Sequence, residues 1–223
     1  MTNKVIEYKD IKLNYGKHTV LSKINFDLNR GEIAFITGKI GTGKTTFLKS
    51  IYAQIKPIGR KAQVLNYNLK KTSIWTIHRL RRQIGYIFQD FYFLNDKTVK
   101  ENLQFVLNAI GISDIKIVNN KIENILKSLS LYDQKDKYPY ELSGGQKQNL
   151  AIARAIITEP KIILADEPTN NLDKETANNI LEKIYKLKDK NTAIIIVTHE
   201  PPSITTFEYS LWKTENGTLI KIK

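Results

Sequence analysis

The segment GKIGTGKT, Gly38–Thr45, constrains the fold of this chain more than any other stretch. It matches the pattern G-x-x-x-x-G-K-[ST] in full, and it lies between an apolar run at residues 33–37 and a predicted helix at residues 45–55. Glycines let such a loop curl until its N–H groups point inward at phosphate oxygens. The segment therefore predicts a nucleotide-binding loop between a strand and a helix of an α/β fold.

The same loop supplies candidate ligands for a nucleotide and for its metal ion. Lys44 would contact the β- and γ-phosphates, and the Thr45 hydroxyl would bind Mg²⁺. The residues expected to bind the nucleotide here are Gly38, Lys39, Ile40, Gly41, Thr42, Gly43, Lys44, Thr45 and Thr46.

Four short apolar runs predict a mainly parallel sheet that is covered on both faces. They are residues 33–37, 84–88, 162–165 and 193–198. In an open parallel sheet, ligands bind outside the carboxyl ends of the strands. The residues just past the four runs all suit phosphate chemistry, and they are Gly38, Gln89, Asp166 with Glu167, and His199.

Each of these polar side chains has a candidate role at the predicted site. Asp166 would hold Mg²⁺ through water, and Glu167 would polarise the attacking water. Gln89 would bridge the metal and the water, and His199 would hydrogen-bond the γ-phosphate. Catalysis would then be positioning plus electrostatic stabilisation, as in other phosphoryl transfers. Taken singly, Gln89 could be a turn residue and His199 the cap of a strand.

Two further regions have sequence patterns that differ from the apolar runs of the predicted sheet. Residues 1–30 alternate in short extended pieces and indicate an antiparallel β lobe. Residues 96–140 have helical periodicity, which begins after a capping box formed by Thr98 and Glu101. We therefore expect a single domain, residues 1–223, with a nucleotide-binding core at 1–95 and 141–223 and a helical subdomain at 96–140.

Tyr15 precedes Gly16 in the first lobe, and its ring could stack on the base of the nucleotide. The alternative is a half-buried tyrosine of a strand. We favour stacking over this alternative.

A second anion seat is predicted at ELSGGQKQNLAIARAI, residues 141–156. Ser143 would cap a helix, and the two glycines after it would leave the backbone N–H groups bare at the positive end of the helix dipole. A second seat for phosphate in one domain calls for an explanation.

Composition and charge narrow the class of protein. The chain has no cysteine, which excludes disulfides and thiolate metal sites and favours a reducing compartment. We see no signal peptide and no apolar run long enough to span a membrane. The formal net charge is +13, with a denser basic patch at residues 78–83. A solvated face explains this charge best, an anionic membrane surface comes second, and nucleic acid comes last because aromatic residues do not interleave with the patch.

Taken in order along the chain, these motifs resemble those of the ATPase subunits of ABC transporters. GKIGTGKTT resembles the Walker A loop, FQD with Gln89 the Q-loop, LSGGQ the signature and IILADEP the Walker B strand. NNLD with Asp173 resembles the D-loop, and THE with His199 the switch. The resemblance covers essentially the whole chain and implies hydrolysis of ATP with Mg²⁺. By this resemblance the catalytic residues are Glu167, His199 and Lys44, and the metal ligands are Thr45, Gln89 and Asp166.

The resemblance also explains the second seat. In that family two subunits pack head to tail, and the signature of one reaches the ATP that is held by the other. This implies a homodimer on ATP binding. The residues that would contact the ATP of the opposite subunit are Ser143, Gly144, Gly145, Gln146 and Asp173.

Within the family, the segment RRQIGYIFQDFYFLNDKTVKENLQFVL is most similar to cell-division ATPases of the FtsE group. This implies an integral membrane partner, FtsX-like or a permease, and a cytoplasmic chain on the inner face of the membrane. Phe91–Leu94 would border the groove for that partner, or else pack locally in the core. Alternatives are the ATPase of a lipoprotein-releasing or macrolide-type exporter and a soluble ABC-type ATPase acting on nucleic acid or ribosomes.

Three asparagines depart from the pattern of the family. Asn66 and Asn170 stand where relatives often have glycine, and Asn149 stands where an arginine usually follows the signature. None of them is among the residues expected to carry the chemistry, so we expect activity to survive.

Overall fold

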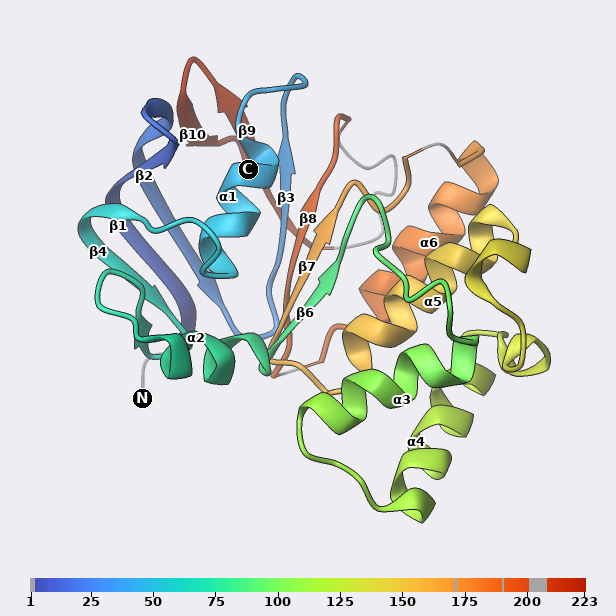
Figure 1. Ribbon diagram of the computed structural model, residues 1–223. Helices are drawn as coiled ribbons and strands as arrows, with labels where there is room; N and C mark the ends of the chain where they lie inside the picture. Colours follow the sequence, from blue (N-terminus) through green and yellow to red (C-terminus); the bar gives the residue numbers. More distant parts are fainter. Residues whose placement is uncertain (1–2, 171, 190, 201–207) are drawn as a thin grey trace.

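The computed structural model describes residues 3–170, 172–189, 191–200 and 208–223, which form two sheets and two groups of helices (Figure 1). The smaller sheet is antiparallel, with strand order β2-β1-β4-β5. Its strands are β1 (Lys4–Tyr15), β2 (His18–Asn29), β4 (Ile58–Val64) and β5 (Tyr67–Asn68). The antiparallel lobe expected at the start of the chain is therefore present, and a later segment completes it.

The larger sheet has six strands in the order β10-β9-β3-β8-β7-β6. All of its neighbouring pairs are parallel except β10 with β9, which are antiparallel strands joined through Asn216 and Gly217. Buried side chains on both faces explain the continuous apolar runs. The strands are β3 (Ile33–Thr37), β6 (Ile84–Ile87), β7 (Ile162–Asp166), β8 (Ala193–Val197), β9 (Ser210–Glu215) and β10 (Thr218–Lys221). The predicted α/β fold with a mainly parallel sheet is confirmed.

Helix α1 (Lys44–Ile51) follows the phosphate loop and lies between the two sheets (Figure 1). Its Phe47 is fully buried and packs edge-on against Tyr8 and Phe26 of the antiparallel sheet. The predicted extension of this helix to residue 55 is wrong, because Ala53 adopts a left-handed conformation with φ 54°. Arg81 donates hydrogen bonds to the carbonyls of residues 52 and 53, which satisfies the end of the helix.

The remaining helices lie on the other side of the large sheet or at its edge (Figure 1). They are α2 (Ile74–Arg81), α3 (Val99–Ala109), α4 (Ile115–Ser128), α5 (Gly144–Ile156) and α6 (Lys174–Lys186), with short 3-10 turns at Tyr132–Gln134 and Pro139–Glu141. Among the described residues, no helix combines the length and apolar character needed to cross a membrane.

The segment 96–140 holds α3, α4, the first 3-10 turn and all but the last residue of the second. The predicted capping box is present, since Thr98 accepts from the Glu101 amide and Glu101 accepts from the Thr98 amide. Buried side chains of α3 and α4 share one apolar cluster with residues of strands β3, β6, β7 and β8. The helical segment therefore has no separate core of its own and is fixed against the sheet.

The structure explains two of the three asparagines that depart from the family pattern. Asn66 lies in the turn between β4 and β5 with φ 69°, a conformation that favours glycine and that asparagine tolerates well. Asn149 is buried in α5, where its amide donates to the Leu129 carbonyl at 3.1 Å and its oxygen accepts from Lys183 at 3.0 Å. Asn149 thus connects α5 to the end of α4 and to α6.

Candidate nucleotide-binding and catalytic site

The phosphate loop leaves the carboxyl end of β3 and enters α1 through glycines that the fold requires. Gly38 has φ 146°, and a Cβ atom there would lie 2.2 Å from the Thr214 hydroxyl. Gly43, the residue before α1, has φ 100°, and its Cβ would lie 2.7 Å from a methyl group of Val20. The loop is therefore held in its curled form by close packing against β2 and β9.

Lys44 is the first residue of α1, and only 4% of its surface is exposed. Its ammonium group donates to the carbonyls of Gly38 at 2.8 Å and Lys39 at 3.1 Å, which fixes the charge over the loop. Burial lowers the pKa of Lys44, whereas the nearby carboxylates of Glu167 and Asp166 act to raise it. The loop thus presents a buried cation between two carbonyls, a suitable seat for phosphate.

Asp166 lies at the end of β7 and is almost completely buried. Its Oδ1 accepts from the Thr45 hydroxyl at 3.1 Å, and its Oδ2 accepts from the Tyr86 hydroxyl at 3.4 Å. Burial raises the pKa of Asp166, Glu167 adds to this effect, and the hydrogen bonds from Thr45 and Tyr86 oppose it. Two of the predicted metal ligands, Thr45 and Asp166, are therefore in direct contact.

Glu167 and His199 form the other half of the catalytic group. Glu167 Oε1 lies 2.7 Å from His199 Nε2 and 3.9 Å from Lys44 Nζ. The other ring nitrogen, His199 Nδ1, lies 3.4 Å from Lys44 Nζ. Glu167 has φ 48°, a left-handed conformation that is uncommon for this residue type. The three residues predicted to be catalytic thus form one contiguous cluster.

A cavity of about 490 Å³ opens over this cluster. Tyr15 lies on its wall with 67% of its surface exposed, so the ring is available to a ligand rather than half-buried in the strand. Ten of the predicted site residues line the cavity: Tyr15, Ile40, Gly41, Gly43, Lys44, Thr45, Thr46, Gln89, Glu167 and His199. Four other residues predicted at this end of the sheet do not line the cavity: Gly38, Lys39, Thr42 and Asp166.

Three lining residues were missed by the sequence analysis: His18, Val20 and Asn170. His18 pairs with Tyr15 across the β1–β2 hairpin, so a hairpin prediction for residues 15–18 could have found it. Asn170 donates to Glu167 Oε2 at 3.4 Å, although the sequence shows it only as a departure from glycine. Val20 packs against the phosphate loop, and no motif in the sequence marks it as a site residue.

The helix cap predicted for the second anion seat is present, but this seat does not join the cavity. Ser143 caps α5, its hydroxyl accepting from the Gln146 amide at 3.3 Å and its amide donating to the Gln146 side chain at 2.9 Å. Ser143 and Gly144 are exposed. Asp173 caps the neighbouring α6 by accepting from Thr176, and these hydrogen bonds lower its pKa. None of the five residues assigned to the opposite subunit's ATP lines the cavity over Lys44.

The signature glycines differ from those of the phosphate loop. Gly144 and Gly145 have helical backbones, and Cβ atoms there would meet only Leu172 at 3.7 Å and Thr176 at 3.6 Å. These are ordinary van der Waals distances, so the fold of this chain does not demand glycine at either position. The bare backbone is instead available to a ligand or a partner.

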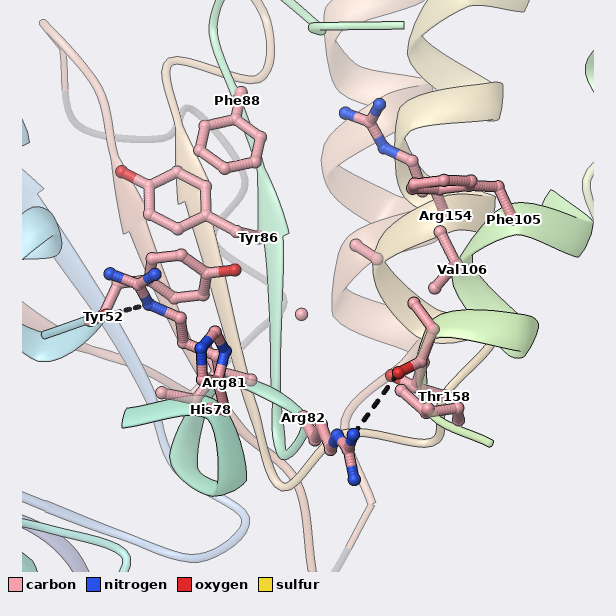
Figure 2. Close-up of a pocket in the computed structure, with 15 residues that line it drawn as sticks. Tyr52, His78, Arg81, Arg82, Tyr86, Phe88, Phe105, Val106, Arg154 and Thr158 are labelled. Atoms are coloured by element: carbon pink, nitrogen blue, oxygen red, sulfur yellow. Dashed lines mark hydrogen bonds between the residues drawn. The ribbon is translucent and has the colours of Figure 1, made fainter. Parts of the chain in front are cut away.

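A second cavity, of about 420 Å³, lies along the edge strand β6. Figure 2 shows the rings of Tyr86 and Phe88 on one side of this strand and Arg154 with Phe105 on the other. Arg82 and Arg81 of the basic patch also line it, and the Arg81 guanidinium lies 4.8 Å from the centre of the Tyr52 ring. Aromatic residues do not interleave with this patch in the sequence, but the fold brings rings from other elements beside it.

The aromatic segment after Gln89 is anchored at Phe91 and Phe93, whereas Tyr92 is exposed. Phe91 and Phe93 stack at 5.3 Å and pack against the apolar cluster of the helical side, which agrees with the local-packing alternative. Arg154 donates to the carbonyls of Phe91 and Tyr92. Burial lowers the pKa of Arg154 to about 10, so the side chain keeps its charge at neutral pH. The nearby cavity is lined by Phe88 rather than by residues 91–94.

The site provides oxygen ligands rather than a preformed cage for a metal ion. The described part of the chain contains no cluster of three or more His, Cys, Asp or Glu side chains that could hold one. The Thr45 hydroxyl and the Asp166 carboxylate are suited to Mg²⁺, which keeps several waters and binds with one or two carboxylates and substrate phosphates. The residues present therefore fit a metal ion that arrives with the nucleotide.

Comparison with known proteins places this site in a family. A family model described as ABC transporter matches residues 21–170. The cell division ATP-binding protein FtsE of Streptococcus pneumoniae serotype 2 is 33% identical over 218 residues, which cover 97% of this chain and 94% of that protein. The arginine transport ATP-binding protein ArtM of Bacillus subtilis is 34% identical over 196 residues, which cover 88% of this chain and 81% of that protein.

A solved structure agrees with these relatives. The ATP-binding cassette MJ0796, a dimer in a post-hydrolysis state bound to ADP and Pi, matches with a TM-score of 0.85 and 27% sequence identity. The match covers 98% of this chain and 99% of that one. With the phosphate loop, the acidic pair and the histidine gathered at one sheet edge, the chain belongs to the ABC transporter family as an ATP-binding domain that hydrolyses ATP.

Proposed function

We propose that two copies of this chain close head to tail around ATP as the ATPase subunits of a membrane complex. The observation that carries this proposal is the separation of the two anion seats. Lys44 is buried at the cavity, whereas Ser143 is exposed at the start of α5 and lies outside that cavity. ATP held by Lys44 would then meet the signature of a second copy. A ligand contacted from both sides favours the closed state only while its terminal phosphate is present.

In this proposal the catalytic cluster acts on water and on the terminal phosphate. Glu167 orients the attacking water and takes up its proton, and Lys44 neutralises charge on the phosphate oxygens. His199, held between Glu167 and Lys44, donates a hydrogen bond to the γ-phosphate. Tyr15 stacks on the base, and the signature residues with Asp173 serve the ATP of the other copy.

Mg²⁺ bound with ATP supplies charge neutralisation on the phosphate oxygens. We infer that Thr45, Asp166 and Gln89 hold it, because the first two are in contact and the third lines the same cavity. Asn170, through its bond to Glu167, helps to orient the carboxylate that faces the water.

The second cavity is the proposed docking groove for the membrane partner. Its walls combine apolar rings with the basic side chains of His78, Arg81, Arg82 and Arg154. Among the described residues, no ion pair joins any of these four to a carboxylate. A segment with apolar and acidic side chains complements this surface, and docking there would hold the chain on the inner face of the membrane.

The subgroup proposed for this chain is FtsE-like, with an FtsX-like partner in cell division. Its support is the similarity to FtsE over nearly the full length of both chains. The similarity to ArtM at comparable identity favours a second candidate, the ATPase of a transporter. An ATPase of a lipoprotein-releasing or macrolide-type exporter belongs to this second candidate. Nucleic acid is the least favoured partner, because the relatives named above are cell-division and transport ATPases.

Capture of the partner tests this proposal. The Glu167→Gln chain, loaded with ATP, serves as bait for detergent-solubilised membranes, and the same bait carrying Lys44→Ala serves as the control. We expect a membrane protein to be retained only by the first bait, together with division proteins. Recovery of a permease with transport components would favour the second candidate. Recovery of nucleic acid or ribosomal proteins alone would contradict both.

A further inference from the structure

The carboxylate of Asp166 is held by one hydroxyl on each oxygen. Thr45 donates to Oδ1 at 3.1 Å and Tyr86 donates to Oδ2 at 3.4 Å. Thr45 is itself a candidate metal ligand, whose oxygen would bind Mg²⁺ through a lone pair while its hydrogen still bonds Asp166. Tyr86 is not a candidate metal ligand, so its bond serves only to orient the carboxylate.

The sheet places Tyr86 against Asp166 for a simple reason of register. Tyr86 of β6 pairs with Leu164 of β7, and side chains two residues apart on a strand share a face. Tyr86 is therefore the diagonal neighbour of Asp166 on the face that also packs α1. The Tyr86 hydroxyl is buried, and a buried phenol normally requires a hydrogen-bond partner, which Asp166 provides.

Aromatic packing fixes the Tyr86 ring in this position. The Phe88 ring stacks on it with centroids 4.1 Å apart, and the Tyr52 ring meets it edge-on at 5.2 Å. These three rings also form part of the wall of the second cavity (Figure 2). The side chain that bonds Asp166 is thus one element of both the ATP site and the edge groove.

We propose that Tyr86 is a positioning residue, which orients the Asp166 carboxylate for Mg²⁺ and connects it mechanically to the wall of the groove. This goes beyond the proposed roles of the ATP-site residues and stands whether or not the groove receives a membrane partner. Tyr86→Phe removes only the hydroxyl. Tyr52→Phe removes a hydroxyl from the same cluster without touching Asp166 and is the matched control.

The measurement is the affinity of each chain for a fluorescent ADP derivative, mant-ADP, once with Mg²⁺ and once with EDTA. ADP avoids both turnover and dimer closure. The gain in affinity that Mg²⁺ provides should fall about two- to tenfold in Tyr86→Phe, the range expected for one hydrogen bond, while the affinity in EDTA stays unchanged. An unchanged gain, or an equal loss with and without Mg²⁺, would overturn the positioning role.

A double-mutant cycle tests the connection to the groove wall. Phe88→Leu removes the ring that stacks on Tyr86 and should lower the Mg²⁺-dependent gain in the parent chain. The same change should have little effect in the Tyr86→Phe background, because the transmitting hydroxyl is already gone. Equal effects in the two backgrounds would contradict the connection and would assign the loss to the neighbouring Gln89. Thermal unfolding of each variant separates these effects from misfolding.

Discussion

The two glycine-rich anion seats of this chain look alike in sequence but differ in what requires their glycines. In the phosphate loop, Gly38 and Gly43 have positive φ and no room for a Cβ atom. In the signature, Gly144 and Gly145 are helical and have that room. The first seat is therefore dictated by this chain's own fold. The glycines of the second seat lower the stability of α5 by up to about 1 kcal/mol each relative to alanine, and no contact within the chain requires them.

The difference extends to the charges around the two seats. Around the phosphate loop, the buried Lys44, Glu167 and His199 contact one another, and Asp166 is bonded to Thr45. The signature seat has a helix terminus capped by Ser143 and an exposed surface. In our proposal the first seat is half of an active site, and the second is a surface that binds the ATP held by another copy of the chain.

The largest effect is expected at the buried lysine. Lys44→Ala removes the charge that faces the phosphates, and we expect kcat/KM for ATP to fall at least about 10²-fold. Lys12→Ala, at an exposed position of β1, changes the net charge equally and should leave hydrolysis unchanged. Similar losses in the two variants would show that net charge, rather than the seat, governs activity.

Glu167→Gln tests whether the two seats act together, because it stops ATP hydrolysis and leaves the residues of both seats unchanged. Loss of a general base lowers turnover by about 10²- to 10⁴-fold. Because the terminal phosphate then persists, ATP should hold the variant as a dimer, which size-exclusion chromatography with light scattering can detect. A chain that binds ATP and stays monomeric would count against closure around the nucleotide.

One alanine at each seat compares the glycines directly. Gly43→Ala should lower the free energy of unfolding and weaken ADP binding, because its Cβ meets Val20 and its φ is strained. Gly144→Ala should leave both unchanged or raise stability by up to about 1 kcal/mol, while ATP hydrolysis falls. Urea titration and mant-ADP binding measure these effects. Equal destabilisation by the two alanines would remove the distinction between the seats.

The smallest effect concerns the helical side. Thr98→Ala removes one half of the capping box of α3 and should cost about 1 kcal/mol of stability. ADP affinity should not change, because this cap lies outside the cavity over Lys44. The urea midpoint checks the first expectation, and a change in ADP affinity would indicate that the helical segment communicates with the phosphate loop in the single chain.

The sequence predicted β3, β6, β7 and β8 well, because each of them is a continuous apolar run with a polar residue close after it, whereas it did not reveal β4 and β5. That is why Gln89, Asp166, Glu167 and His199 could be assigned to one sheet edge from local pattern alone. The pattern did not reveal the end of α1, which depends on Arg81 reaching the carbonyls from α2.

The other features that the sequence did not predict are contacts between elements that lie far apart in the sequence. Tyr86 bonds Asp166 across 80 positions, and Asn170 acquires its role only beside Glu167. Tyr52, Phe88 and the basic patch also meet only after folding. Local patterns predict strands, caps and loops, whereas these pairs depend on strand register and helix packing.

Crosslinking between two chains tests the central claim most directly. The chain has no cysteine, so Ile40→Cys and Glu141→Cys can each be introduced alone, both at exposed positions beside one of the two seats. The two variants, distinguished by tags and carrying Glu167→Gln, are mixed with a short bismaleimide. The account predicts mixed crosslinked pairs only when ATP and Mg²⁺ are present. Crosslinks between identical variants, or none while ATP is bound, would contradict a site shared head to tail.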